Sequence, residues 1–119
     1  MEASYSVTPD KSRNLVRVKM AGFFDRKDVQ EFAATYRLEL AHLKAPGHLT
    51  LVDIAAMQIQ AQDIVGAFAA LLASPDIRSR KLAFVCSSSL ARLQAQRLTD
   101  REGVEFFDRM GDAEAWLSA

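Results

Sequence analysis

Apolar residues along this chain form short unbroken runs that alternate with longer stretches of helical spacing. The central run, His48 to Asp53, is almost wholly apolar until it reaches the aspartate, which is typical of a buried strand in a parallel sheet. Apolar residues at helical spacing follow from Asp63 to Ser74 and predict a crossover helix. We therefore expect Asp53 at the carboxyl end of a strand, the edge of an open α/β sheet where ligands and partners usually bind.

The same criteria predict the other elements. The expected strands are 5–8, 15–21, 81–86 and 104–107, and the other expected helices are 25–43, 90–98 and 112–117. The order ββαβαβαβα predicts an α/β fold with four helices and a mostly parallel sheet of about five strands, in which the initial hairpin supplies an antiparallel N-terminal edge strand. Because no repeat or linker divides the sequence, we expect one domain over residues 1–119.

Two local details of this prediction bear on function. Residues 54–60 are predicted to be a loop that is unusually apolar for a surface connection, with Ile54, Met57 and Ile59 as its large residues. In the helix 90–98, the spacing predicts that Leu90, Leu93 and Leu98 face the core and that Gln94 faces solvent.

Composition narrows the class of protein. Fifteen Lys and Arg balance fifteen Asp and Glu, so the net charge is zero and nucleic acid binding is disfavoured. The single cysteine, Cys86, excludes an intrachain disulfide and any multi-cysteine metal site, and it fits a reducing compartment. No signal-like amino terminus and no long apolar run occur, so we expect no transmembrane segment and a cytoplasmic protein.

The order of elements and several short motifs together resemble the SpoIIAA-like proteins, a bacterial branch of the STAS group. The motifs are Gly22-Phe23-Phe24, Leu51-Val52-Asp53, Leu82-Ala83-Phe84-Val85, Phe106-Phe107-Asp108 and Asp112-Ala113-Glu114-Ala115-Trp116-Leu117. The resemblance covers essentially the whole chain and implies the STAS fold, which is more distantly related to CRAL-TRIO lipid-carrier domains.

The resemblance also implies a protein partner, but this sequence departs from the family pattern after Asp53. Regulatory STAS proteins bind a partner kinase and carry a phosphorylatable serine directly after the aspartate that corresponds to Asp53. Here Ile54-Ala55-Ala56 follows, and these residues have no hydroxyl group to accept a phosphate. The phosphorylation switch of the regulatory proteins is therefore not expected in this chain.

Candidate site residues lie after the predicted central strands. Asp53 either positions a ligand or partner or accepts backbone N–H groups from the following segment. Ser87 and Ser88 either bind an anion at a helix start or cap that helix. Asp25, Asp53 and Asp108 are expected at one sheet edge, but their spacing is not that of a metal site, so we expect no metal and no cofactor.

No catalytic residue is predicted. Cys86 closes an apolar strand, where cysteine is usually an inert hydrophobic residue. The histidines, His42 and His48, are placed away from Asp53, so a Ser–His or Cys–His pair is not expected.

Two functions remain open. The first is a non-enzymatic regulatory or protein-interaction module that binds a protein partner or forms a homodimer through Asp53, Ile54, Met57, Ile59, Ser87 and Ser88. The alternative is a carrier of a small apolar ligand or lipid, with a pocket between the helix 63–74 and the sheet. The apolar residues of segment 54–59 either fold inward and only cap the core, or lie open as a surface suited to a partner helix, a second subunit or an acyl chain.

Overall fold

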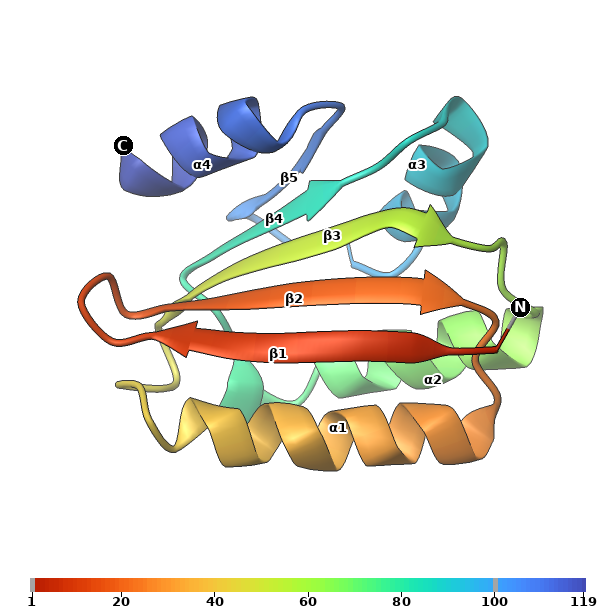
Figure 1. Ribbon diagram of the computed structural model, residues 1–119, viewed down its shortest axis with the longest axis horizontal. Helices are drawn as coiled ribbons and strands as arrows, with labels where there is room; N and C mark the ends of the chain where they lie inside the picture. Colours follow the sequence, from red (N-terminus) through yellow and green to blue (C-terminus); the bar gives the residue numbers. More distant parts are fainter. Residues whose placement is uncertain (1, 100) are drawn as a thin grey trace.

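The computed structural model describes residues 2–99 and 101–119 and consists of a five-stranded sheet with helices on both faces (Figure 1). The strands lie in sequence order across the sheet: β1 (Ser4–Asp10), β2 (Leu15–Gly22), β3 (Leu49–Met57), β4 (Lys81–Val85) and β5 (Val104–Phe107). The helices are α1 (Arg26–Leu40), α2 (Gln62–Leu72), α3 (Ser89–Gln96) and α4 (Met110–Ser118), with a short 3-10 helix, η1, at Pro75–Ile77. The predicted order and fold class are confirmed.

The sheet is mixed in the predicted way. Strands β1 and β2 form an antiparallel hairpin, with Ser4 opposite Ala21 and Asp10 opposite Leu15. Every other neighbouring pair is parallel. Parallel neighbours need crossover connections, and a helix lies between each of these pairs along the chain. The carboxyl ends of β2 to β5 consequently point to one edge of the sheet, which we call the carboxyl edge.

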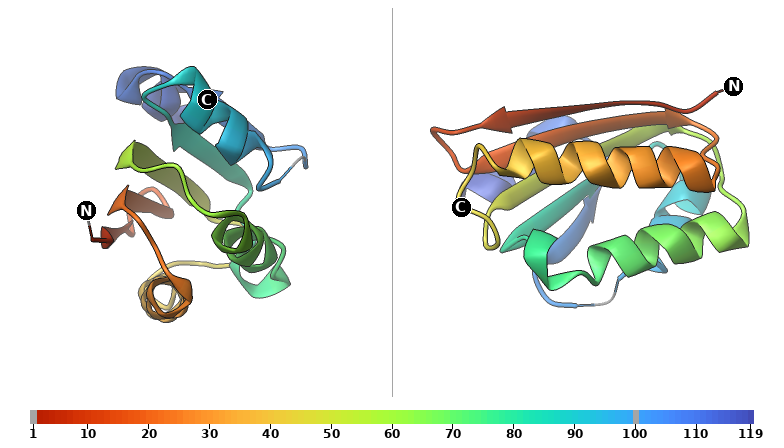
Figure 2. Two further views of the ribbon diagram at one scale, coloured as in Figure 1. Left: turned by 90° about the vertical axis from the view of Figure 1, so that its right-hand side faces the viewer. Right: turned by 90° about the horizontal axis from the view of Figure 1, so that it is seen from below.

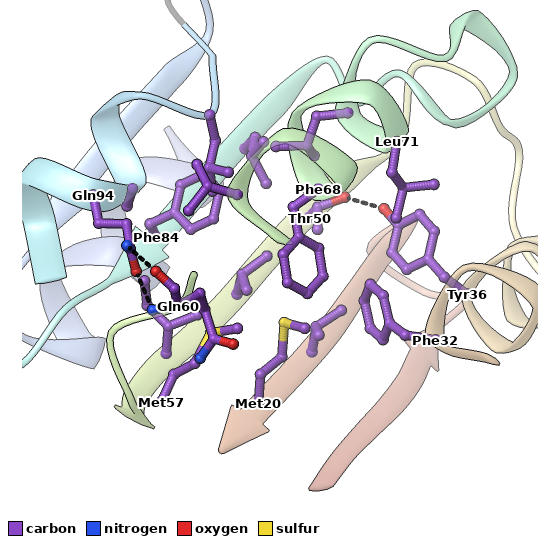
Figure 3. A pocket seen from close by; sticks show the side chains of 18 of the residues that line it. Met20, Phe32, Tyr36, Thr50, Met57, Gln60, Phe68, Leu71, Phe84 and Gln94 are labelled. Atoms are coloured by element: carbon purple, nitrogen blue, oxygen red, sulfur yellow. Dashed lines mark hydrogen bonds between the residues drawn. The ribbon is translucent and has the colours of Figure 1, made fainter. Parts of the chain in front are cut away.

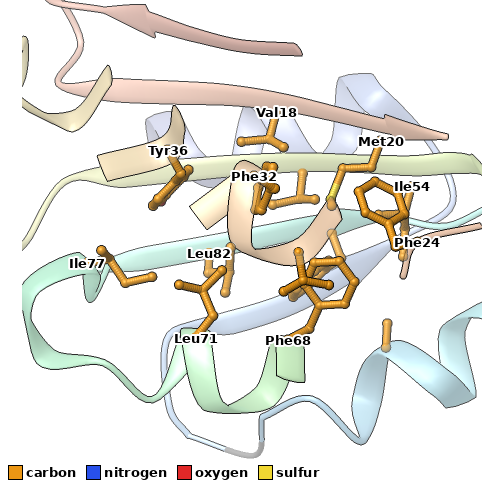
Figure 4. Packing of buried hydrophobic residues seen from close by; sticks show 14 of the residues in the cluster. Val18, Met20, Phe24, Phe32, Tyr36, Ile54, Phe68, Leu71, Ile77 and Leu82 are labelled. Carbon is orange, nitrogen blue, oxygen red and sulfur yellow. The ribbon is translucent and has the colours of Figure 1, made fainter. Parts of the chain in front are cut away.

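The two faces of the sheet bury separate cores. Helices α1 and α2 lie side by side across one face (Figure 2), and Ala95 of α3 packs into the same large cluster. Within it, the rings of Phe32 and Phe68 meet edge to face with their centroids 6.2 Å apart (Figure 4). Helix α4 covers part of the other face through Ala113 and Leu117. Strands buried on both faces explain the nearly continuous apolar runs in the sequence.

Helix α1 begins where the sequence predicts. The Asp25 carboxylate accepts the Asp28 N–H at 2.8 Å, and the Asp28 carboxylate accepts the Asp25 N–H at 2.9 Å, which makes a reciprocal capping box. The helix ends at Leu40 rather than at the predicted Leu43. Residues 41–43 form a turn instead, in which each N–H group donates a hydrogen bond to the carbonyl three residues earlier.

Strand β3 ends four residues later than predicted, at Met57 rather than Asp53, so the segment 54–57 is strand and not loop. This extension stays paired because β2 runs beside it: Ala21 lies opposite Ala56, and Gly22 opposite Met57. Lys19 pairs with Asp53 and Ala21 pairs with Ala56, so β3 has one more residue than β2 between these two pairs. The register shifts there as at a β-bulge. Asp53 therefore lies inside the strand, and the carboxyl end of β3 is at Met57.

The orientation of α3 also differs from the prediction. Leu90 and Leu93 are 60% and 57% exposed, whereas Ala95 is buried and Gln94 is half-buried. The small Ala91 and Ala95 pack against the core, and the Gln94 amide hydrogen-bonds the chain between β3 and α2. Hydrogen bonds and close packing of alanines thus determine the buried face of this two-turn helix, against the leucine spacing.

Candidate ligand cavity and partner surface

An apolar cavity of about 90 Å³ lies between the sheet and helices α1, α2 and α3 (Figure 3). Strands β2 to β4 form its floor, and α2 lies over it with Phe68 and Leu71 directed inward. The residues that give it its apolar character include Met20, Val52, Ile54, Phe68, Leu71 and Phe84. Because its lining also includes the exposed Ile59 and Arg78, the cavity reaches the surface.

At the carboxyl edge, a pair of hydrogen-bonded glutamines lines the cavity. The Gln60 N–H donates to Gln94 Oε1 at 2.8 Å, and Gln94 Nε2 donates to the Gln60 carbonyl at 2.9 Å (Figure 3). The buried Gln60 side chain also accepts the Phe24 N–H at 2.8 Å and donates to the carbonyls of Gly22 and Gln58. One glutamine therefore joins the ends of β2 and β3 to α3.

At the other end of the cavity, four buried side chains form a polar cluster. Tyr36 Oη lies 2.9 Å from Thr50 Oγ1 and 3.1 Å from His48 Nε2, and Ser79 Oγ lies 3.3 Å from the same His48 nitrogen. Thr50 and Ser79 also hydrogen-bond each other. Burial raises the pKa of Tyr36 and lowers the pKa of His48, so both groups are held in their neutral forms.

This cluster contains the Ser–His contact that the sequence did not predict. The expectation failed because Ser79 comes from the loop before β4, 31 residues from His48, and no motif marks it. His48 Nδ1 is buried and has no hydrogen-bond partner in the part of the chain that the structure describes. A serine nucleophile is activated by a base that a third group orients, and among the described residues none is in place to orient His48 through Nδ1.

The predicted candidates separate into two groups. Ile54 is buried in the cavity, Met57 is half-buried and lines it, and Ile59 lies at its mouth with 41% exposure. Asp53 does not line the cavity; its carboxylate accepts the Ala55 N–H at 3.0 Å, which is the backbone role considered above.

The serines and the other aspartates are engaged locally. Ser87 and Ser88 are exposed, and the Ser88 hydroxyl caps α3 by accepting the Ala91 N–H at 3.1 Å. Asp25 belongs to the capping box of α1, and Asp108 forms an ion pair with Arg92 at 2.6 Å. Within residues 2–99 and 101–119, no three His, Cys, Asp or Glu side chains are grouped so that they could hold a metal ion.

An exposed apolar surface adjoins the glutamine pair. Ile59 precedes Gln60, while Leu93 precedes Gln94 and Leu90 lies about one turn earlier on α3. All three are exposed, at 41%, 57% and 60%. We call these three residues the carboxyl-edge surface. None of the helices that the structure describes has the length and apolar character needed to cross a membrane.

Comparisons with known proteins support the fold. Neither a protein-family model nor a curated protein sequence matches the chain. Among solved structures, an uncharacterized DUF3478-family protein with a SpoIIAA-like fold from Shewanella loihica PV-4 matches with a TM-score of 0.74 at 20% identity, over 98% of this chain and 96% of that one. An anti-sigma factor antagonist from Mycobacterium paratuberculosis matches with a TM-score of 0.61 at 11% identity, over the same shares. At these identities, the matches show that the chain has the SpoIIAA-like fold.

Proposed function

We propose that this chain, which has the SpoIIAA-like fold, is a non-enzymatic regulatory module that binds a protein partner. The observation that carries the proposal is the carboxyl-edge surface, where Ile59, Leu90 and Leu93 are exposed on two segments that the hydrogen bonds between Gln60 and Gln94 join. Apolar side chains grouped on a surface favour association with another protein. The two hydrogen bonds between Gln60 and Gln94 hold the two segments of this surface together, so little ordering is needed on binding.

The fold of an anti-sigma factor antagonist supports the same class of function, since that protein is named for its action on another protein. We further propose that partner binding here is not switched by phosphorylation beside Asp53. The three residues after Asp53 have no hydroxyl group, and they continue strand β3 with Ile54 buried in the core. A regulated affinity would then need another signal.

Leu93→Asp is the variant that tests the partner surface, because it places a charge on an exposed position without entering the core. Leu38→Asp is the matched control, since Leu38 is 71% exposed on α1 and lies outside the surface. Met57 is unsuitable because it is half-buried against the cavity.

In the experiment, tagged wild type and both variants are cross-linked in an extract of the source cells, and their bound proteins are identified by quantitative mass spectrometry. We expect at least one protein, a second copy of the chain included, that wild type and Leu38→Asp retain and Leu93→Asp loses. Identical sets of bound proteins for Leu93→Asp and wild type would overturn the proposal.

A second candidate function, carriage of a small apolar ligand, is favoured by the cavity beneath α2. Native mass spectrometry of the purified protein tests it, with an added mass as the expected result. Val65→Phe should remove that mass by filling the cavity, because Val65 lines it from α2. Ala70→Phe, at an exposed position of the same helix, should retain it. A spectrum of the bare chain, together with no uptake of butan-1-ol, would exclude this function.

A further inference from the structure

The end of the cavity near η1 carries positive charge in an otherwise apolar lining. Arg78 and Arg101 both contribute to the lining there, together with Tyr36, Thr50 and Ser79. Arg101 is held in place because its guanidinium donates to the Ser79 carbonyl at 3.0 Å and to the Glu102 carbonyl at 2.9 Å. A cavity that is apolar along its length and cationic at one end suits a ligand with the same asymmetry.

Arg78 and Arg101 are the arginines in the cavity lining, and like Arg80, Arg97 and Arg109 they form no ion pair among the described residues. Five arginines form ion pairs with Asp or Glu: Arg13, Arg17, Arg26, Arg37 and Arg92. Among the described residues, neither Arg78 nor Arg101 lies within 4.0 Å of a carboxylate oxygen. Partial burial and the charge of Arg78 together lower the pKa of Arg101. Two cations that approach each other favour binding of an anion between them.

The size of the cavity limits the ligand. Its volume of about 90 Å³ is roughly three times the share of one water molecule in the liquid, and it is smaller than the engineered cavity of about 150 Å³ that binds benzene. Such a space holds a chain of about three carbons beside the charged group but not a much longer acyl chain. The guanidinium fork matches a carboxylate because it can donate two parallel hydrogen bonds to it.

We propose that the cavity binds a short-chain aliphatic carboxylate, with its chain packed against Phe68 and Leu71 and its carboxylate held by Arg78 and Arg101. This inference rests on the second candidate function and specifies the ligand class for it. The Ser79 hydroxyl and the neighbouring Tyr36 and Thr50 hydroxyls line the same end and provide a polar environment for the carboxylate.

The test compares butyrate with butan-1-ol, which has the same chain length but no charge, by isothermal titration calorimetry on the full chain. We expect butyrate to bind at least about tenfold more tightly than the alcohol, since charge-assisted hydrogen bonds are the stronger ones. Octanoate should bind more weakly than butyrate because its chain exceeds the cavity. Equal binding of butyrate and butan-1-ol would overturn the carboxylate assignment and leave the carrier function standing, whereas no binding of either would overturn both.

Two substitutions locate the charged end. Arg78→Gln removes an exposed charge and Arg101→Gln a half-buried one, and each should weaken the binding of butyrate about tenfold without changing the affinity for butan-1-ol. Arg78→Gln keeps the test decisive if Arg101→Gln does not fold. Arg97→Gln, at an exposed position after α3, is the control and should bind butyrate like wild type. Unchanged butyrate affinity in Arg78→Gln and in folded Arg101→Gln would overturn the placement of the carboxylate.

Discussion

Gln60 and Gln94, 34 residues apart, exchange two hydrogen bonds that fasten α3 to the end of β3. Each bond joins the backbone of Gln60 to the side-chain amide of Gln94, so one side chain satisfies both a donor and an acceptor of an irregular segment. This pair lines one end of the cavity and holds the two parts of the carboxyl-edge surface together. It therefore connects both functions proposed for the protein.

Gln94→Ala should destabilise the protein by about 1–3 kcal/mol, because it leaves the Gln60 N–H and carbonyl without their partner. Urea unfolding measures the decrease in the free energy of unfolding. Hydrogen exchange, compared with that of wild type, should accelerate more in the amides of α3 than in those of α1. Gln96→Ala, at an exposed position of the same helix, is the control and should change the free energy of unfolding by less than about 0.5 kcal/mol. Equal effects of the two substitutions would contradict the role of the pair.

The buried His48 should make stability depend on pH. Burial lowers its pKa in the folded protein below the ordinary value of 6.5, so below about pH 6.5 the unfolded chain takes up a proton that the folded chain does not. The free energy of unfolding should therefore be highest above this pH and fall as the pH drops toward the folded-state pKa, by up to about 1.4 kcal/mol per unit for one proton.

Urea unfolding at pH 7.5, 6.5 and 5.5 measures this slope. His48→Gln should flatten it, because glutamine does not titrate. The exposed His42 provides the control, since His42→Gln should keep the wild-type slope. A His48→Gln protein whose stability falls with pH as steeply as that of wild type would show that other groups cause the dependence.

Cys86 should be unreactive in the native protein. It is 1% exposed, and burial raises the pKa of its thiol, so both the access to it and its thiolate fraction are low. Alkylation by iodoacetamide, followed by mass spectrometry, should be slower in buffer than in denaturing urea by a factor on the order of one hundred or more. Rapid labelling in buffer would mean that the end of β4 opens frequently.

The capping box of α1 should contribute measurably to stability. Asp25→Ala removes the side chain that accepts the Asp28 N–H, and it should cost about 1 kcal/mol in the free energy of unfolding. Glu31→Ala, at an exposed position within the same helix, is the control and should cost less than about 0.5 kcal/mol. The two variants can be compared by urea unfolding at one pH.

The sequence by itself determined the order of the elements and the class of fold. Short apolar runs such as Leu82–Val85 alternate with helical spacing, and these patterns depend on neighbours a few residues apart. The start of α1 was equally local, because Asp25 and Asp28 cap the helix from within four residues. Parallel strands joined by helices then leave few topologies open, and the observed sheet is the one expected.

The tertiary structure decided the features on which function depends. The length of β3 follows from its pairing with β2, and the buried face of α3 follows from the contact of Gln94 with Gln60. The cationic end of the cavity likewise needs both Arg78 and Arg101. No local sequence pattern indicates that these two residues lie at the same site. Such contacts join residues far apart in the chain, and their energies come from burial and hydrogen-bond satisfaction that exist only once the sheet has formed.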